Sequence, residues 1–591
     1  MTSTPQPQGT SSSMVSPARP NSAPPSPAVR SVTPPLPPSR DIPKDFKSSL
    51  SAWWSTSSYK EARLAEERLL RRMASFEPSS TASLSPPSHS STKSESKGWF
   101  FGGSSTSSSA TATTAASKKE LDDKLPVEEV GQIKDPLPLQ NGLVATLKNV
   151  FIQTPNPNDA PQHPADPREI TSASATSSLS DLSQTSINSS HGKIKKHCKK
   201  DKNQGKLVDY INTLEITSNE NKDSKEAVVV LHGYAAALGF FFRNWDPVSH
   251  SAAETGRRTF FLDWLGMGLS SRPSPSLLHS NSNTPVPTRV SRAEHFFLSS
   301  LESWREKVGI EKMVLVGHSL GGYLASAYAV RYPERVSGLI LVSPAGIPHG
   351  PEYVKYPLTS ELSSKDKLPG SGSRPTQSPP ETPQELDEAT NAAEAEFNNA
   401  GQKPSASDAN EAKGEAKDWA KQREQSLVRR SLMKVFVAGW ERGVSPFSLL
   451  RGAGPLGPLW VGKYSSRRFA AQSEEDVKDL HSYIYGTSIM KGSGEYCISH
   501  ILAPGAYARI PIVDRINRLK VPVTIMYGDN DWMDVEGGKA SVEALKQAGN
   551  NNASCHVVPK AGHHLYLDNP DYTNNLLDQA IKAIPQAQVS P

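Results

Sequence analysis

From residue 206 onward, short apolar runs alternate with longer amphipathic segments. The longer segments have helical periodicity: Phe297, Leu301, Trp304 and Val308 recur at spacings of four, three and four. Short apolar strands that alternate with helices predict an α/β fold, with a mostly parallel sheet covered on both faces. The expected strands are Leu207–Glu215, Ala227–Leu231, Thr259–Leu262, Met313–Val316, Leu339–Val342, Val521–Tyr527 and Cys555–Val558.

Much of the 591-residue chain is too polar to join such a core, because only 36% of its residues are hydrophobic and 49 are prolines. Low apolar content cannot offset the entropy lost on ordering. The predicted organisation is a disordered tail at 1–47, a tryptophan-containing amphipathic helix at 48–76, low-complexity sequence at 77–125, a first part of the core at 126–350 with a low-complexity insertion at 153–204, a cap at 351–510 with a disordered insertion at 358–425, and a second part of the core at 511–591.

Charge and cysteine content exclude several classes of protein. A net charge of +5 on so long a chain is no nucleic-acid signature. Three cysteines cannot form a disulfide framework, which fits a reducing compartment. No apolar stretch reaches the length of a membrane span, and residues 1–40 lack the apolar centre of a signal peptide. The same residues carry arginines but no acid, as a mitochondrial presequence does, although their prolines disfavour the required helix.

Residues 48–76 differ from the tail because they combine tryptophans with a strong helix former. Trp53 and Trp54 precede Tyr59–Leu70, which is rich in Ala, Leu, Glu and Arg. Tryptophan prefers the polar edge of a bilayer, and a basic helix is attracted to anionic lipid, so the segment is a candidate membrane anchor. The sequence leaves open the alternative that this helix packs on the main domain.

Gly317–Gly321, with the sequence Gly-His-Ser-Leu-Gly, joins the expected strand Met313–Val316 to an expected helix over Gly322–Tyr332. The glycines permit a sharp turn that lifts the hydroxyl of Ser319 out of the sheet edge, and the helix N-terminus below it favours negative charge. Such a pattern is common by chance. Its position between a strand and a helix makes Ser319 the candidate nucleophile.

A second turn directly follows the expected strand Ala227–Leu231. It can direct a backbone N–H, from Tyr234 or Ala235, at the oxyanion that forms when a nucleophile attacks an acyl group. The second donor would be the N–H of Leu320, beside the nucleophile. We expect the His232 side chain to pack in the turn rather than take part in chemistry.

Two further strand ends supply a carboxylate and an imidazole. Asp531 follows Val521–Tyr527, and His563 follows Cys555–Val558. The carboxyl ends of parallel strands meet at one edge of a sheet, so the aspartate can orient the histidine, which then serves as the base for the serine. The alternatives that remain open are Asp529 and Asp534 for the carboxylate and His564 for the imidazole.

The chain order Ser319, Asp531, His563 resembles that of the α/β-hydrolase family, and the surrounding motifs resemble its lipid-acting branch. This branch includes fungal cardiolipin-specific deacylases, fungal lysophosphatidic acid acyltransferases and an animal lipid-droplet lipase co-activator. The resemblance implies acyl-ester chemistry on phospholipid or lysophospholipid, with residence in mitochondria or, alternatively, in the cytoplasm at lipid droplets. The co-activator lacks the nucleophilic serine. Because this chain has that serine, the resemblance favours a catalytic function. The motifs that carry the resemblance are His232–Tyr234, Asp263–Pro273, Gly317–Tyr323 and Tyr527–Asp534.

The branch also carries a His-x-x-x-x-Asp acyltransfer motif, which His563 and Asp568 match. The next residues, Asn569 and Pro570, look like a helix N-cap followed by proline at the first helical position. Asp568 could therefore simply favour the positive end of that helix. Both interpretations stay open.

The expected cap holds apolar residues that could line an acyl-chain channel or form an ordinary core, and arginines that could hold phosphate or remain surface charges. No metal-ligand spacing is found, and no cofactor is expected. The apolar residues are Leu432, Val435, Phe436, Trp440, Phe447, Leu449 and Leu450, and the arginines are Arg429, Arg430, Arg442, Arg451, Arg467 and Arg468.

Three functions follow from these patterns. The first is a serine acyl-hydrolase that removes fatty acyl chains from phospholipid at a membrane or lipid-droplet surface; by resemblance, its specific form is a cardiolipin deacylase. The second is a lysophosphatidic acid acyltransferase with acyl-coenzyme A as co-substrate. The third is a non-catalytic lipid-surface adaptor. Protein partners are not predicted.

Overall fold

The computed structural model describes residues 36–56, 58–76, 136–161, 163–164, 208–278, 280, 284–349 and 435–586. The segments predicted as low-complexity at 77–125 and disordered at 358–425 lie outside the described residues, as do most of 1–47 and of 153–204. Among the described helices, none is both long and apolar enough to cross a bilayer.

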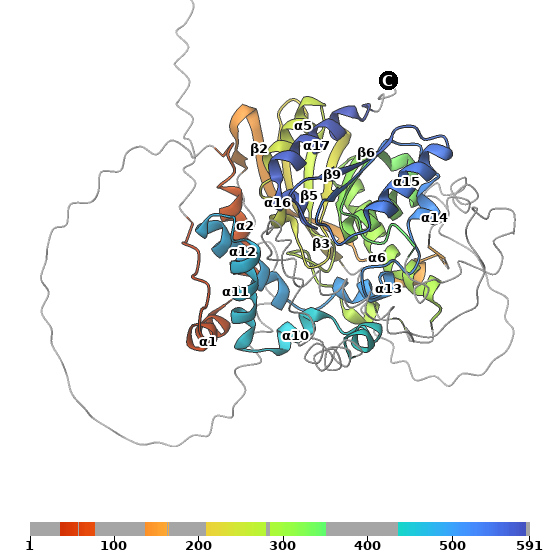
Figure 1. Ribbon diagram of the computed structural model, residues 1–591. Helices are drawn as coiled ribbons and strands as arrows, with labels where there is room; N and C mark the ends of the chain where they lie inside the picture. Colours follow the sequence, from red (N-terminus) through yellow and green to blue (C-terminus); the bar gives the residue numbers. More distant parts are fainter. Residues whose placement is uncertain are drawn as a thin grey trace, which may run out of the picture. The chain divides into compact units, whose positions relative to one another are not determined.

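A nine-stranded sheet lies at the centre, in the order β1-β2-β3-β5-β4-β6-β7-β8-β9 (Figure 1). The strands from β4 to β9 pair in parallel, as the sequence predicts, whereas β1, β2 and β3 are antiparallel to their neighbours. The strands are β1 Leu137–Pro138, β2 Leu143–Gln153, β3 Val208–Ser218, β4 Glu226–Leu231, β5 Arg258–Leu262, β6 Lys312–His318, β7 Val336–Val342, β8 Val523–Gly528 and β9 Ala553–Val558.

Each central strand is buried on both faces, which explains its unbroken apolar sequence. In β4, Val229 contributes to one hydrophobic core and Val228 and Val230 to the other. Helices α6, α7, α13, α14 and α15 supply the first core, and α5 and α17 the second. The bounds are α5 Trp245–Glu254, α6 Val286–Lys307, α7 Leu320–Arg331, α13 Ile498–Ile501, α14 Val513–Ile516, α15 Val535–Gln547, α16 Leu565–Asp568 and α17 Pro570–Ala583.

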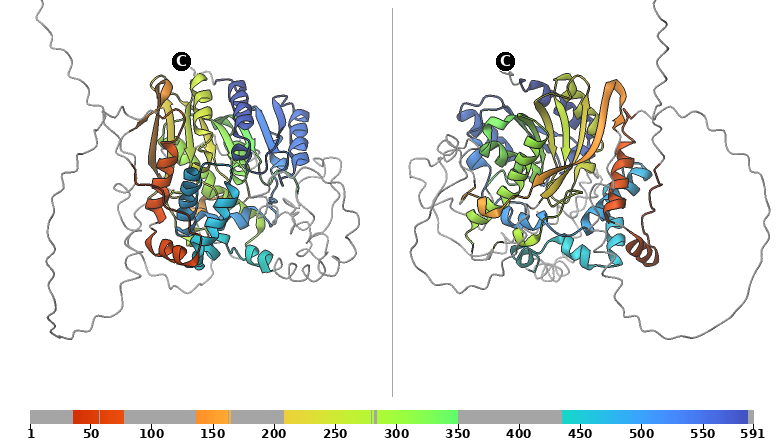
Figure 2. Two further views of the ribbon diagram at one scale, coloured as in Figure 1. Left: turned by 60° about the vertical axis from the view of Figure 1, so that its left-hand side comes forward. Right: turned by 180° about the vertical axis from the view of Figure 1, so that it is seen from behind.

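Three helices from the predicted cap lie beside two helices from the start of the described chain (Figure 2). The cap helices are α10 Pro446–Gly452, α11 Leu456–Arg468 and α12 Glu474–Ile489, and the early helices are α1 Phe46–Ser55 and α2 Ser58–Leu70. Helix α2 packs against α12, and α1 packs against α11. The predicted helix Tyr59–Leu70 therefore packs on the main domain, which is the alternative to a membrane anchor. The two tryptophans lie on a separate helix, α1.

Candidate active site

The nucleophile turn joins β6 to α7 through Ser319. The backbone of this serine has φ 52° and ψ −119°, a conformation that side-chain-bearing residues rarely adopt. The sharp turn fits only because glycines flank it: a Cβ at Gly321 would lie 2.5 Å from the carbonyl oxygen of Leu231. Strand β6 thus delivers the serine hydroxyl to the carboxyl edge of the sheet, as the sequence predicts.

The structure brings the three predicted triad residues together although they lie far apart in the sequence. His563 Nε2 lies 3.0 Å from Ser319 Oγ, and His563 Nδ1 lies 3.2 Å from Asp531 Oδ1. With the proton on Nδ1, the imidazole donates to the carboxylate and accepts from the serine hydroxyl. A serine so placed can be deprotonated as it attacks an acyl group.

The Asp531 carboxylate is fully buried, whereas the His563 side chain is 10% exposed. Burial alone would raise the pKa of Asp531, but the His563 imidazole and a hydrogen bond from the Met533 N–H outweigh it and lower that pKa below its usual value. The carboxylate therefore stays ionised beside the histidine. A charge in this position stabilises the imidazolium that forms during proton transfer.

The loop that carries His563 is held from both sides. The His318 ring hydrogen-bonds the carbonyl oxygen of His563 at 3.0 Å, and Asp529 accepts the N–H of Ala561 at 3.0 Å. Burial lowers the pKa of His318 well below its usual value, so the ring is neutral and donates from Nε2. The Trp532 ring packs 5.0 Å from the His563 ring. The sequence alone does not predict these contacts of His318 and Trp532.

The predicted oxyanion donors lie on two segments that meet at Ser319. Leu320 is the first residue of α7, where a backbone N–H has no acceptor within the helix. The turn after β4 packs directly on the nucleophile, since a Cβ at Gly233 would lie 2.8 Å from the Cβ of Ser319. Ala235, in that turn, has a φ of 58°. The arrangement is compatible with donation from Leu320 and from Tyr234 or Ala235, which stays a prediction.

The alternative acid and base candidates occupy other places. Asp529 binds the backbone of the histidine loop, and Asp534 caps α15 by accepting the N–H of Glu536. His564 stacks on the Phe240 ring at 6.4 Å instead of approaching the serine. None of these three side chains hydrogen-bonds the serine or His563 within the described part of the chain.

Asp568 does not cap the following helix. The cap of α17 is Asn569, whose side chain accepts the N–H of Tyr572, with Pro570 at the start as predicted. Asp568 instead accepts the N–H of Gly562 at 3.0 Å and pairs with Arg468 of α11 at 2.9 Å. It therefore links the cap to the residue that precedes the catalytic histidine.

Two aromatic rings of the cap lie near Tyr234, in the predicted oxyanion turn. Trp440 and Phe447 lie 6.4 and 5.5 Å from the Tyr234 ring, measured between ring centroids. Of the arginines proposed for phosphate, Arg451 pairs with Glu495, and Arg468 pairs with Asp568 as described. Leu432, Arg429 and Arg430 lie outside the described residues.

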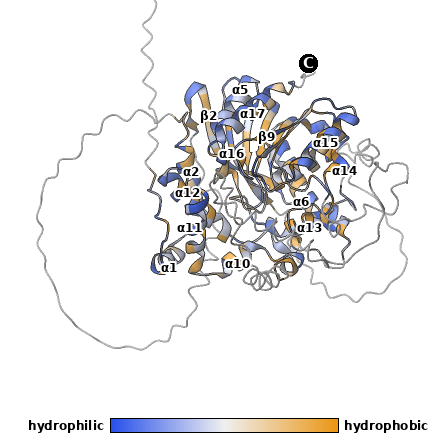
Figure 3. Cartoon of the chain, viewed as in Figure 1, coloured by the Kyte–Doolittle hydropathy of each residue, from blue (hydrophilic) through white to orange (hydrophobic). Residues whose placement is uncertain are grey.

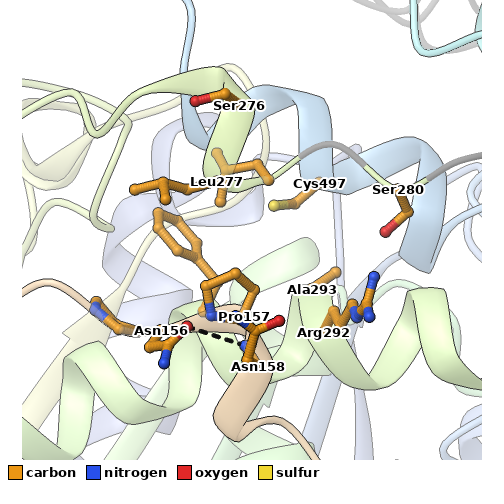
Figure 4. A pocket seen from close by; sticks show the side chains of 12 residues that line it. Asn156, Pro157, Asn158, Ser276, Leu277, Ser280, Arg292, Ala293 and Cys497 are labelled. Atoms are coloured by element: carbon orange, nitrogen blue, oxygen red, sulfur yellow. Dashed lines mark hydrogen bonds between the residues drawn. The ribbon is translucent and has the colours of Figure 1, made fainter. Parts of the chain in front are cut away.

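A pocket of about 270 Å³ lies apart from the triad, between α6 and the loops at its side (Figure 4). Asn156 and Asn158 lie on one wall, and Ser276 and Leu277 on another, with Arg292 of α6 at the rim. No triad residue lines it. The candidate site is therefore the one identified by the Ser319 geometry rather than by this pocket.

Comparison with known proteins agrees with the geometry. The model of the alpha/beta hydrolase fold family matches residues 226–570. A 1-acylglycerol-3-phosphate O-acyltransferase of Arabidopsis thaliana is 32% identical over 369 residues, which cover 61% of this chain and 67% of that protein. A (lyso)-N-acylphosphatidylethanolamine lipase of Mus musculus is 29% identical over 373 residues, 62% of this chain and 82% of that protein.

A third relative, the 1-acylglycerol-3-phosphate O-acyltransferase ABHD5 of Sus scrofa, is 26% identical over 364 residues, 60% of this chain and 77% of that protein. The predictions of an α/β fold and of a hydrolase-type enzyme are thereby confirmed. The match to the family model, together with these relatives, leads to one conclusion: the chain belongs to the α/β-hydrolase fold family, in its lipid-acting branch.

Proposed function

We propose that this protein is a serine acyl-hydrolase that removes fatty acyl chains from phospholipid. The observation that carries the proposal is the hydrogen-bonded series in which Asp531 orients His563 and His563 lies 3.0 Å from the hydroxyl of Ser319. The lipid class rests on the relatives, whose names refer to acylglycerol phosphate and N-acylphosphatidylethanolamine.

In the proposed reaction, His563 takes the proton of Ser319 as its oxygen attacks the ester carbon. The negative charge that develops on the carbonyl oxygen is held by backbone N–H groups, of which each typically contributes about a hundredfold or more in rate. His563 then protonates the leaving lysolipid oxygen as the ester bond breaks, leaving an acyl-serine. Water, deprotonated by the same histidine, attacks the acyl-serine and releases the fatty acid and the free serine.

Cardiolipin is the specific substrate that we propose first, at a mitochondrial membrane; the lipid-droplet surface is the alternative location. The test is turnover of vesicles that contain cardiolipin, phosphatidylcholine or N-acylphosphatidylethanolamine, by wild type and by Ser319→Ala. We expect release of fatty acid from cardiolipin and a loss of at least about a thousandfold in the variant. Preferred turnover of N-acylphosphatidylethanolamine would reject the cardiolipin assignment and keep the hydrolase.

We further propose that the protein reaches its substrate through α1. Phe46, Leu50, Trp53 and Trp54 are exposed and recur at helical spacing, so they form one outward face. Buried Ser49 fixes the neighbouring side of α1 to the start of α11, because its hydroxyl donates to the Pro455 carbonyl and accepts the N–H of Leu459. An ordinary amphipathic helix buries its apolar side. This one turns it outward.

The cap helices α10 and α11 (Figure 3) also carry exposed apolar side chains, and α11 packs against α1. On α10 and α11, Leu449, Leu456 and Trp460 are 66%, 39% and 49% exposed. The exposed cations beside them suit a surface of anionic lipid headgroups rather than a neutral protein groove. These cations are Lys44, Lys47, Lys463 and Arg467.

Acyl transfer is the second candidate, and the contacts of Asp568 favour it. Through Gly562 and Arg468, this carboxylate sets the backbone next to His563 and joins it to the cap, which controls whether water or a lysolipid hydroxyl meets the acyl group. The test supplies acyl-coenzyme A and lysophosphatidic acid to Ser319→Ala and Asp568→Asn. Transfer that survives the serine change but not the aspartate change would replace the hydrolase mechanism for that activity.

A non-catalytic adaptor is the third candidate from the sequence, and the assembled triad counts against it. A fluorophosphonate probe should label wild type and leave Ser319→Ala unlabelled. Folded wild type that resists the probe would favour the adaptor.

A further inference from the structure

Helix α2 carries a buried ion pair whose hydrogen bonds extend to the cap and to the central sheet. Glu66 is 0% exposed, and its Oε2 lies 2.5 Å from Nη1 of Arg63. The other oxygen, Oε1, accepts the Tyr483 hydroxyl of α12 at 3.0 Å and the Asn212 amide of β3 at 3.2 Å. One carboxylate thus joins an N-terminal helix, the cap and the central sheet.

Two of these partners lead to the turn that follows β4. The Tyr483 oxygen accepts the N–H of Gly239 at 3.2 Å. The Asn212 amide also donates to Asp263 Oδ2 at 2.8 Å, and Asp263 Oδ1 accepts the N–H of Leu238 at 2.7 Å. Gly239 and Leu238 are consecutive residues of the short helix η3, Leu238–Phe241, at the exit of the predicted oxyanion turn.

The carboxylate of Asp263 is enclosed by its own loop. Its Oδ2 accepts the N–H of Leu269 at 2.7 Å, and a side chain at Gly268 would collide with it. The entrance of the turn is tied to the same loop, since His232 Nε2 accepts the N–H of Trp264 at 3.0 Å. Burial lowers the pKa of His232, which keeps the ring neutral and able to accept. This loop, Asp263–Leu269, contains no triad residue and no predicted oxyanion donor.

We propose that Glu66 is a positioning residue for the oxyanion turn: it holds Tyr483 and Asn212, which in turn fix the backbone of Gly239 and Leu238. This inference rests on the proposed acyl-ester chemistry of Ser319. An oxyanion donor is effective only when it is fixed before the charge develops, and small displacements of such groups cost large factors in rate. Glu66 lies outside residues 226–570, which the family model matches.

The energetics of burial argue that the pair is more than packing. Taking a carboxylate and a guanidinium out of water costs several kcal/mol each, so well-packed apolar residues of similar volume are often at least as stabilising. The charge of Arg63 offsets the burial of Glu66 only in part, since the pKa of Glu66 stays above its usual value. The Glu66 carboxylate makes directional hydrogen bonds to the groups that fix the turn. An apolar side chain could not make these bonds.

The test uses a soluble short-chain ester, p-nitrophenyl butyrate, so that membrane binding does not contribute. We expect Glu66→Gln and Tyr483→Phe each to lower kcat about tenfold, with KM changed less than twofold. If both act through one path, the double variant should be no slower than the slower single variant. Glu67→Ala is the matched control on the same helix, because Glu67 pairs with Arg71 and not with this network; it should retain full kcat.

Three results would overturn the inference. One is full kcat in folded Glu66→Gln. Another is a double variant whose loss is the product of the single losses. The third is a loss of activity that simply follows the fraction of protein titrated by a fluorophosphonate, which would mean a smaller folded population. Should Glu66→Gln fail to fold, Tyr483→Phe removes a single hydroxyl and tests the same link. Retained ester turnover in Ser319→Ala would instead reject the proposed function itself.

Discussion

Helices α1 and α2 are consecutive in the chain, but α1 exposes apolar side chains whereas α2 buries charged ones. Helix α1 leaves Phe46 and Trp54 exposed, at 56% and 79%, whereas α2 buries Arg63, Glu66 and Arg68. Burial of charge in one helix and exposure of aromatic surface in the other both lower stability in water. Each proposal gives one of these unfavourable surfaces a use: α1 would keep its apolar side for lipid, and α2 would use its charges to hold other groups in place.

The largest expected effect comes from the charged interface between α2 and α12. Asp479 of α12 is fully buried and pairs with Arg68 and Arg72, each at 2.6 Å. Asp479→Ala leaves the buried Arg68 guanidinium without its carboxylate, so we expect the free energy of unfolding to fall by about 3–5 kcal/mol. Urea unfolding followed by circular dichroism measures this change in the free energy of unfolding.

The control for this change is a pair at the surface. Lys539 and Glu536 of α15 form an ion pair whose side chains are 55% and 77% exposed. Lys539→Ala should leave the free energy of unfolding nearly unchanged, because solvent screens this pair. Equal effects of Asp479→Ala and Lys539→Ala would show that α2 is not held by its buried charges.

A smaller effect is expected for α1, and only at a lipid surface. Replacing both Trp53 and Trp54 with alanine removes the amphipathic rings that would enter the interface, so we expect fatty-acid release from anionic vesicles to fall about tenfold. Turnover of a soluble ester should be unchanged. The control is Tyr572→Ala, since Tyr572 is 45% exposed on α17, which packs on α5 and not on the cap.

A reduced rate in Tyr572→Ala as well would indicate a general loss of apolar surface. A vesicle rate that survives the tryptophan changes would remove α1 from the proposed docking surface.

The comparison also predicts a pH dependence of stability at Glu66 in α2. Burial raises the pKa of Glu66 to about 7, against the opposing charge of Arg63, whereas a glutamate in an unfolded chain titrates near 4.5. The folded state thus binds this proton more tightly, and its contribution to stability is lost as the pH rises through about 7. From pH 5 to pH 8, the free energy of unfolding of wild type should fall by about 2 kcal/mol more than that of Glu66→Gln.

Arg63, Asp263 and Tyr483 face Glu66 in both proteins, so the difference between their stability curves isolates this carboxylate. Parallel curves for wild type and Glu66→Gln would show that Glu66 keeps an ordinary pKa.

The sequence predicts the triad well because local features determine it. Ser319 and Asp531 each follow an apolar strand, and all such strands end at one edge of the sheet, so the chemistry follows from the topology. Strand β2 was missed although Leu143, Ala145 and Leu147 alternate with partly exposed residues. Its period of two differs from the unbroken apolar runs that identify the central strands.

The Glu66 network could not be predicted because no local signal marks it. An arginine and a glutamate three residues apart on a helix are usually a solvated pair. Their burial here depends on Asn212 and Tyr483, which are distant in the sequence. The place of Asp568 was missed for a similar reason, since its partner Arg468 belongs to the cap.

The ladder between β2 and β3 has a further consequence for the evolution of the chain. Gln153, the last residue of β2, is the register partner of Val208, the first residue of β3. The intervening sequence therefore leaves and re-enters the sheet at adjacent points, whatever its length. Each doubling of a flexible loop costs only about 0.6 kcal/mol in closure entropy. A reporter domain inserted between residues 164 and 208 would therefore have its two ends close together beside this ladder.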